Sequence, residues 1–192
     1  KYMNPKIEKS KIIHIKSLQK QGITKYELYR FIEQNQYEKV NHGIYVLPNI
    51  WIDERVILSI KYPQAVFSHD EALYFHGLID REPNRHTITI YSGYGVSKLN
   101  QSGVKVFTVS KELLEVGREY IKTDTEMQIP IYNLERTICD LIRSRKKIEI
   151  QDFKTALKTY IQRNDKDLNR LMEYAKLFHV DQLVRGYLEV ML

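Results

Sequence analysis

Two histidines and an aspartate near the middle of the chain are of the types that bind divalent metals and help to hydrolyse phosphoesters. His69 and Asp70 are adjacent, and His76 follows seven positions after His69. A metal site needs three or four ligands that converge on one ion, and only His86 adds another imidazole nearby. Asp70 also suits the first turn of a helix, where the helix dipole favours an acid. We therefore expect no metal site here.

The other candidates for enzyme chemistry are weaker still. Cys139 is the only cysteine and has apolar neighbours, whereas a reactive thiol needs a cationic neighbour or a helix N-terminus. We expect a buried structural cysteine in a protein of the reducing cytoplasm. Gly93-Tyr94-Gly95 lacks the third glycine and the following helix of a dinucleotide-binding loop. We expect no catalytic residues and no cofactor.

Basic residues are the second source of chemistry, because they can bind polyanions. The net charge is +6 at pH 7, and residues 1–49, with nine basic and four acidic residues, hold +5 of it. Such a field attracts nucleic acid or an anionic membrane surface. No apolar run approaches the ~20 residues that span a bilayer. A solvated face of a small domain would carry the same charge, so charge alone leaves both readings open.

A second basic group consists of Arg143, Arg145, Lys146 and Lys147. At the end of a helix, such cations stabilise the C-terminus by ~0.3–1 kcal/mol. Alternatively, they form a second surface that contacts a polyanion. We favour the helix end, because an apolar pattern resumes at Ile148 directly after the cluster.

The N-terminal cations must be positioned by a helix and a hairpin. Helical spacing of Ile12, Ile15 and Leu18 predicts a first helix over 5–21, and the capping box of Thr24 and Glu27 predicts that a second begins there. The second helix has an apolar face of Leu28, Phe31, Ile32 and Asn35 and an opposite face of Lys25, Tyr26, Tyr29, Arg30 and Glu33. Two β-rich runs, 37–40 and 44–47, flank Asn41-His42-Gly43 and predict a hairpin.

A basic helix followed by a β-hairpin is the order of a winged helix-turn-helix, which places the helix in the major groove of DNA. The fold class expected is α+β, with this domain over 1–49 and a mixed α/β domain over 50–192 that ends in a helical bundle. In the second domain we expect a helix over 52–62, a capping box at Ser68–Glu71 that opens a helix to Gly77, strands over 86–91, 104–109 and 128–132, and helices over 133–145, 150–163, 165–178 and 181–191.

Three motifs in order resemble the AbiEi-type antitoxins of bacterial abortive-infection systems. They are Thr-Lys-x-x-Leu-x-x-Phe-Ile with Gly-Ile-Tyr-Val-Leu-Pro over 24–48, Ser-His-x-x-Ala-Leu-x-x-His-Gly-Leu over 68–78, and Glu-Arg-Thr-x-x-Asp over 135–140. The resemblance covers almost the whole chain. The family usually has two helices before the recognition helix, and only about 20 residues precede Thr24 here. Residues 5–21 therefore either break into two short helices or form a curtailed first helix.

The resemblance implies a winged helix that represses the operon of an antitoxin and its toxin by binding promoter double-stranded DNA at inverted repeats. It also implies a C-terminal region that counteracts a nucleotidyltransferase-like toxin without a stable complex, which is type IV behaviour. The expected DNA contacts are Thr24, Lys25, Tyr26, Tyr29 and Arg30 on the helix, and Lys39, Asn41 and His42 on the hairpin. Asn41-His42 replaces the arginines common at the family's wing tip. The candidate antitoxicity patch is Arg143, Arg145, Lys146 and Lys147.

Three alternatives remain. Tyr26 and Tyr29 could instead pack against the hairpin or the second domain. The whole protein could be an interaction adaptor whose winged helix has lost DNA binding. A nuclease is the weakest reading, because no Asp…Glu-x-Lys core follows residue 50.

Overall fold

The structure is a computed structural model that describes residues 7–191, and it divides into two compact units. Unit 1 comprises the chain up to Pro63 together with Thr123–Met127, and unit 2 comprises Gln64–Lys122 and the chain from Gln128 onward. This division falls later than the boundary after residue 49, because it assigns α3 (Glu54–Lys61) to unit 1. Each unit combines helices with strands, so the α+β class is confirmed.

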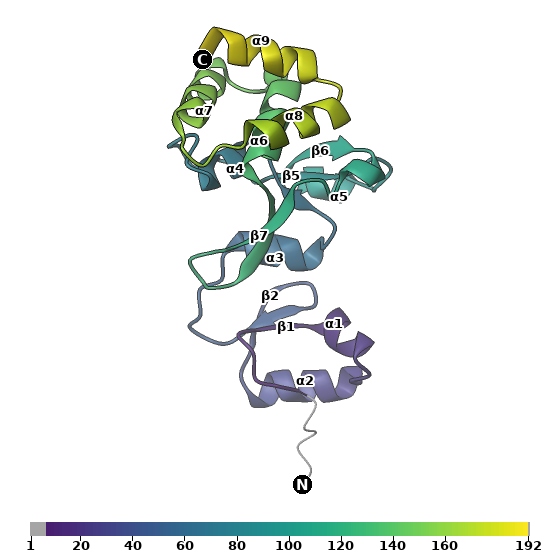
Figure 1. Cartoon of the computed structure of the whole chain (residues 1–192). Coiled ribbons are helices and arrows are strands. Elements are labelled where there is room, and N and C mark those ends of the chain that lie inside the picture. Colours follow the sequence, from purple (N-terminus) through teal and green to yellow (C-terminus); the bar gives the residue numbers. More distant parts are fainter. Residues whose placement is uncertain (1–6, 192) are drawn as a thin grey trace. The chain divides into compact units, whose positions relative to one another are not determined.

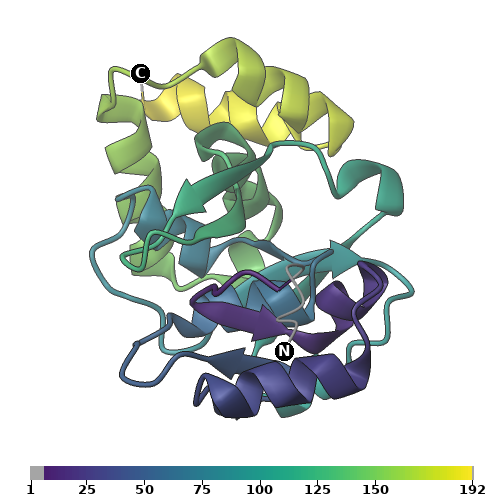
Figure 2. The same ribbon diagram turned by 90° about the horizontal axis from the view of Figure 1, so that it is seen from below.

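Unit 1 builds a three-stranded sheet and a pair of short helices before α3. In chain order they are β1 (Ile12–His14), α1 (Ile15–Lys20), α2 (Lys25–Gln34), β2 (Glu38–Asn41) and β3 (Ile44–Val46). The strands are antiparallel in the order β1-β3-β2. Figures 1 and 2 show α1 and α2 in purple beside this sheet. The unit's core consists of Ile13, Ile15, Ile23, Leu28, Ile32 and Tyr37.

The first helix is shorter than its apolar spacing predicted. Ile12–His14 pairs with Ile44–Val46 as a strand, and the helix begins only at Ile15. β-branched side chains favour a strand, and pairing with β3 satisfies the backbone of this segment. Among residues 7–21 a single curtailed helix forms, and positions 5 and 6 of the predicted helix lie outside the described residues. α1 ends before Gly22, whose φ of +87° suits glycine.

The predicted hairpin is confirmed. β2 and β3 pair in antiparallel fashion around the turn at His42-Gly43, and Gly43 has a φ of +71°. The register shifts between Lys39 and Asn41, which marks a bulge in β2.

Unit 2 contains a five-stranded mixed sheet in the order β6-β5-β4-β8-β7. Its strands are β4 (Val66–Phe67), β5 (Thr87–Tyr91), β6 (Lys105–Val109), β7 (Arg118–Lys122) and β8 (Gln128–Tyr132). Two neighbouring pairs are parallel, β4 with β8 and β5 with β6, and the other pairs are antiparallel. The three strands expected from alternation are present, whereas β4 and β7 were not predicted.

Unit 2 also contains α-helices. They are α4 (Asp70–Phe75), α5 (Ser97–Gln101), α6 (Leu134–Arg143), α7 (Ile150–Gln162), α8 (Leu168–Leu177) and α9 (Asp181–Met191). The last four match the predicted helices, and α6 contacts α7, α8 and α9. Figure 1 shows these four, from green to yellow, gathered at one end of unit 2. Within residues 7–191, every helix is too short or too polar to cross a membrane.

Candidate nucleic-acid interface

The N-terminus of α2 is fixed by the predicted capping box. The Thr24 hydroxyl oxygen accepts a hydrogen bond from the backbone N–H of Glu27 at 3.3 Å. In return, the Glu27 carboxylate accepts from the Thr24 backbone N–H at 2.9 Å and from the Thr24 hydroxyl at 2.8 Å. Two backbone N–H groups that a helix start leaves unpaired are thereby satisfied. The first turn of α2, which carries Lys25 and Tyr26, is held in place by this cap.

The outward face of α2 consists of basic and aromatic side chains. Leu28 and Ile32 are buried, whereas Lys25, Tyr26, Tyr29 and Arg30 are exposed, as predicted. Within residues 7–191 neither Lys25 nor Arg30 pairs with a carboxylate. These cations are therefore available to an external anion.

The two tyrosines of this face behave differently. The Tyr29 ring meets the ring of Tyr45 on β3 edge-on, with centroids 6.3 Å apart, and the Lys25 ammonium lies 5.8 Å from the Tyr29 centroid. Packing against the hairpin, which the sequence left open for both tyrosines, thus applies to Tyr29. Tyr26 is 73% exposed, so the hairpin leaves most of its side chain uncovered.

The hairpin offers fewer exposed polar side chains for contact with DNA than the helix does. Lys39 and His42 are exposed, and Asn41 is half-buried. The Asn41 side-chain oxygen accepts from the His42 backbone N–H at 2.8 Å, so Asn41 shapes the turn. The candidate interface of unit 1 is therefore the α2 face with Lys39 and His42 on the adjoining hairpin.

The basic cluster of unit 2 divides into two kinds of residue. Arg143 is the last residue of α6, donates to the Asp140 carboxylate at 3.0 Å and lies 4.9 Å from the Phe178 ring centroid. Arg145 donates to the carbonyl of Ile142 at 3.2 Å, as expected for a cation at a helix end. Lys146 and Lys147 are exposed in the 3-10 turn Arg145–Lys147. Arg143 thus serves the fold, while the other three face solvent at least in part.

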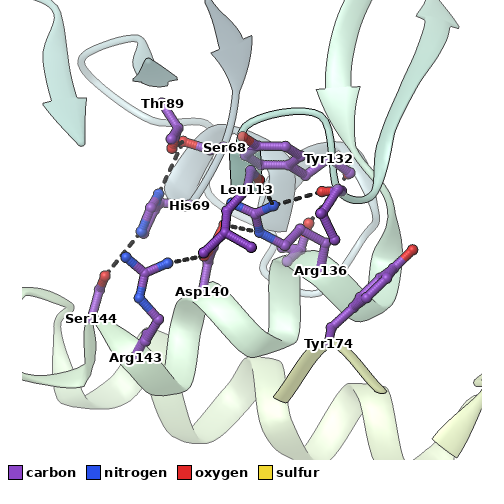
Figure 3. A network of polar contacts seen from close by, with 12 residues as sticks. Ser68, His69, Thr89, Leu113, Tyr132, Arg136, Asp140, Arg143, Ser144 and Tyr174 are labelled. Carbon is purple, nitrogen blue, oxygen red and sulfur yellow. Dashed lines mark hydrogen bonds and ion pairs between the residues drawn. The ribbon is translucent and has the colours of Figure 1, made fainter. Parts of the chain in front are cut away.

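Close to this cluster lies a buried arginine, Arg136, whose role the sequence did not predict. Arg136 is 0% exposed, donates from Nε to Asp140 at 3.0 Å and from Nη1 to the carbonyls of Leu113 and Val116 at 3.0 and 2.6 Å. Its guanidinium also lies 3.9 Å from the Tyr132 ring centroid. Figure 3 shows Asp140 between Arg136 and Arg143. This network holds α6 to the segment before β7, so it is structural.

His69 occupies a strained turn between β4 and α4. Its φ of 50° and ψ of −121° are rare for an L-residue. Its ring stacks on Phe107 at 3.5 Å with planes 9° apart. The ring nitrogens contact two hydroxyls, Nδ1 with Ser68 at 2.9 Å and Nε2 with Ser144 at 3.0 Å, and Thr89 donates to Ser68 at 2.8 Å (Figure 3). The predicted capping box at Ser68 is wrong: His69 is the N-cap residue of α4, and the Ser68 hydroxyl is engaged with Thr89 and His69 instead.

The charge state of His69 follows from its surroundings. Burial, together with the nearby cations Arg143 and Lys105, lowers the pKa of His69 well below its ordinary value. The imidazole is therefore neutral near pH 7, with one nitrogen donating and the other accepting. The only sign in the sequence that His69 has a role in this turn is the Ser-His pair of the second motif.

Two of the residues first considered for chemistry, Cys139 and His76, are engaged within unit 2. Cys139 is fully buried, as predicted, and burial raises the pKa of its thiol to about 12. His76 Nε2 lies 2.7 Å from the carbonyl oxygen of Tyr132. Within the described part of the chain, no three His, Cys, Asp or Glu side chains converge as metal ligands.

Comparison with known proteins gives a similarity of fold. No family model and no curated protein match the chain. The chain is similar to the crystal structure of the RV2827C protein from Mycobacterium tuberculosis, with a TM-score of 0.57 and 12% sequence identity. The similarity covers 86% of this chain and 66% of the other, so the chain spans just under two thirds of that protein. At this identity the two share a fold, and the likeness carries no statement about activity.

Proposed function

We propose that this protein is a DNA-binding repressor and antitoxin of a toxin–antitoxin operon. Unit 1 acts as a winged helix that binds promoter DNA, and unit 2 counteracts a nucleotidyltransferase-like toxin. The observation that carries the DNA-binding part is the outward face of α2, on which Lys25 and Arg30 are exposed without a carboxylate partner among residues 7–191. The toxin-directed part is supported by the three sequence motifs alone.

The arrangement of unit 1 supports this assignment. Two helices joined by a short turn with a glycine, here Gly22, are typical of helix-turn-helix DNA-binding domains. In such domains the N-terminal residues of the second helix contact base edges in the major groove. On α2 these residues are Lys25, Tyr26, Tyr29 and Arg30. The β2–β3 hairpin would act as the wing, with Lys39 and His42 against the phosphate backbone.

The test is a gel shift of the full chain on its own promoter region, comparing Lys25→Ala/Arg30→Ala with the wild type. A bidentate Arg–guanine contact is worth ~1–3 kcal/mol of discrimination. We therefore expect the double variant to bind the promoter at least about fivefold more weakly. The matched control is Lys154→Ala/Lys158→Ala, which removes two exposed cations from α7. Equal affinity of the α2 variant and the wild type at matched salt would refute this placement of the recognition helix.

For unit 2 we propose that the antitoxic surface includes Arg145, Lys146 and Lys147. Arg136, Asp140 and His69, the central residues of the second and third motifs, are occupied inside the unit, so they support the surface without forming it. The triple variant Arg145→Gln/Lys146→Gln/Lys147→Gln should melt normally and fail to rescue cells that express the toxin. Full rescue by this variant would move the antitoxic surface elsewhere.

A protein-interaction adaptor is the second candidate, favoured by exposed aromatic rings in unit 1. Tyr26 is 73% and Trp51 is 68% exposed, which suits burial against another protein. Salt separates the two functions. Binding dominated by phosphates weakens steeply between 50 and 200 mM salt, whereas apolar docking changes little.

A further inference from the structure

A partly buried phenylalanine lies among cations at the edge of the unit 2 sheet. Phe107 is on β6, the edge strand, and Lys105 lies on the same face of that strand two positions earlier. The ammonium groups of Lys105 and Lys147 lie 5.4 and 5.7 Å from the Phe107 ring centroid. We call Phe107, Lys105, Lys147 and the supporting His69 the Phe107 platform.

The Phe107 ring is held in place by His69 on one of its faces. The His69 imidazole covers one face of Phe107 at 3.5 Å, and the hydroxyls of Ser68 and Ser144 hold both nitrogens of that imidazole. A ring fixed in this way loses little conformational entropy when a ligand binds. The strained backbone of His69 persists because these contacts determine it, and such strain is found disproportionately at ligand-binding sites.

The cations of the platform are available to an anion. Within residues 7–191 no carboxylate pairs with Lys147, nor with Arg145 and Lys146 beside it in the chain. Lys105 does have a partner, the Asp70 carboxylate at 3.1 Å, but both side chains are about one-third exposed. Exposed pairs of this kind contribute at most ~1 kcal/mol, so an incoming phosphate can share the Lys105 ammonium.

We propose that the Phe107 platform binds an unpaired nucleotide of single-stranded nucleic acid. The base stacks on the Phe107 ring, and the flanking phosphates pair with Lys105 and Lys147, whose flexible side chains extend toward them. Stacking on an aromatic side chain within a basic groove is how proteins bind single strands without reading their sequence. Duplex DNA is a poor ligand for this site, because its bases are already stacked on their neighbours. The site is in unit 2 and is independent of the DNA binding proposed for α2.

The experiment measures fluorescence anisotropy of a labelled 12-nucleotide RNA, the DNA strand of the same sequence, and the corresponding DNA duplex. All proteins are full-length and carry Lys25→Ala/Arg30→Ala, so that the α2 face does not contribute. Loss of one base–aromatic stack should weaken single-strand binding of Phe107→Leu by about 5- to 150-fold, and Phe107→Tyr should retain it. The matched control is Tyr120→Leu, which removes another exposed ring beside a cation, Arg118, on the opposite edge strand β7.

Two further measurements separate contact with the strand from a loss of fold. Lys147→Gln should lower the slope of log affinity against log salt by about 0.7 for a single strand. In a Trp51→Phe background, Phe107→Trp should keep binding, and its fluorescence should be quenched when a base stacks on it. Tighter binding of the RNA or of the DNA strand supports the proposal and identifies the source of the nucleotide. Equal affinity of Phe107→Leu and its parent, an equal loss in Tyr120→Leu, unchanged fluorescence, or tighter binding of the duplex than of both strands would each overturn it.

Discussion

The cations of α2 and those of α6 have opposite surroundings. On α2, Lys25 and Arg30 are exposed and, within the part of the chain that the structure describes, have no carboxylate partner. On α6, Arg136 is wholly buried and shares Asp140 with Arg143, which is itself partly covered. The difference is set by the acid: Asp140 lies four positions after Arg136 on the same helix and is buried with it. A basic residue that pairs with a buried acid therefore stabilises the fold, whereas one without such a partner remains accessible to a ligand.

The sharpest test of this comparison is Arg136→Met beside Arg30→Met. Removing one partner of a buried ion pair typically costs 3–5 kcal/mol, because the other charge stays buried. Asp140 would keep only Arg143, so we expect a loss of about 3–5 kcal/mol in the free energy of unfolding. Arg30→Met at an exposed site should change it by at most about 0.5 kcal/mol. Urea denaturation followed by circular dichroism measures both, and equal effects would show that the buried and the exposed arginine do not differ in their contribution to stability.

The basic cluster over 143–147 also contains both kinds of cation, one paired with a buried acid and the others without a carboxylate partner within residues 7–191. Arg143→Gln removes a charged hydrogen bond to a buried carboxylate, which is worth ~1.5–3 kcal/mol. The triple change of Arg145, Lys146 and Lys147 to Gln should cost no more than the fraction of a kcal/mol typical of surface sites. Thermal melting of the two variants decides the point. A triple variant less stable than Arg143→Gln would mean that the whole cluster serves the end of α6.

His69 gives a test in pH. The pKa of His69 is lowered in the folded state. Below about pH 6.5 its imidazole therefore binds a proton in the unfolded chain but stays neutral in the folded chain. The contribution of His69 to stability is therefore complete above pH 6.5 and is lost on acidification, by about 1.4 kcal/mol at pH 5.5 if the folded imidazole stays neutral. Melting at pH 7.5 and 5.5 should show a smaller acid-induced loss for His69→Gln than for wild type, with exposed His42→Gln as the control. An unchanged loss in His69→Gln would contradict the buried neutral imidazole.

The smallest effect expected is at the start of α2. Thr24→Ala removes the hydroxyl that accepts from Glu27 and should cost ~1 kcal/mol of stability, whereas Thr24→Ser should cost less because it keeps the cap. If α2 is the recognition helix, Thr24→Ala should also weaken promoter binding. Melting and gel shift on the same samples connect the two readouts. A Thr24→Ala protein that melts like wild type would show that packing alone holds the first turn.

Local signals predicted much of this fold. The Thr24–Glu27 box, the apolar stripe of α2 and the Asn41-His42-Gly43 turn all reside within a few residues of the elements they specify. The four C-terminal helices were also predicted from local sequence. α7 and α8 each bury one stripe with helical spacing, whereas α6 is buried along nearly its whole length. The exposed candidate residues of α2 followed from that periodicity, without knowledge of the rest of the chain.

The predictions failed where the local structure depends on residues that are distant in the sequence. Ile12 has the spacing of a helix, but a partner strand 34 positions later, at Val46, draws it into a sheet. β7 reads as a polar segment because it is an edge strand, and its pairing with β8 supplies the order that its composition does not. Ser68 has the pattern of a cap, yet Thr89 and His69 take its hydroxyl. Neither the role of Arg136 nor that of His69 could be predicted, since each depends on groups from separate elements.

The His69 turn also has a consequence for folding kinetics. Its supports are Phe107 and Ser144, and the contact with Ser144 spans 75 positions of the chain. Contacts with such sequence separation form late, after the loops between them have closed. The strained turn should therefore be unformed in the transition state for folding. Substitutions at His69 should accelerate unfolding and leave the refolding rate nearly unchanged, so this residue would set how long unit 2 persists rather than how fast it forms.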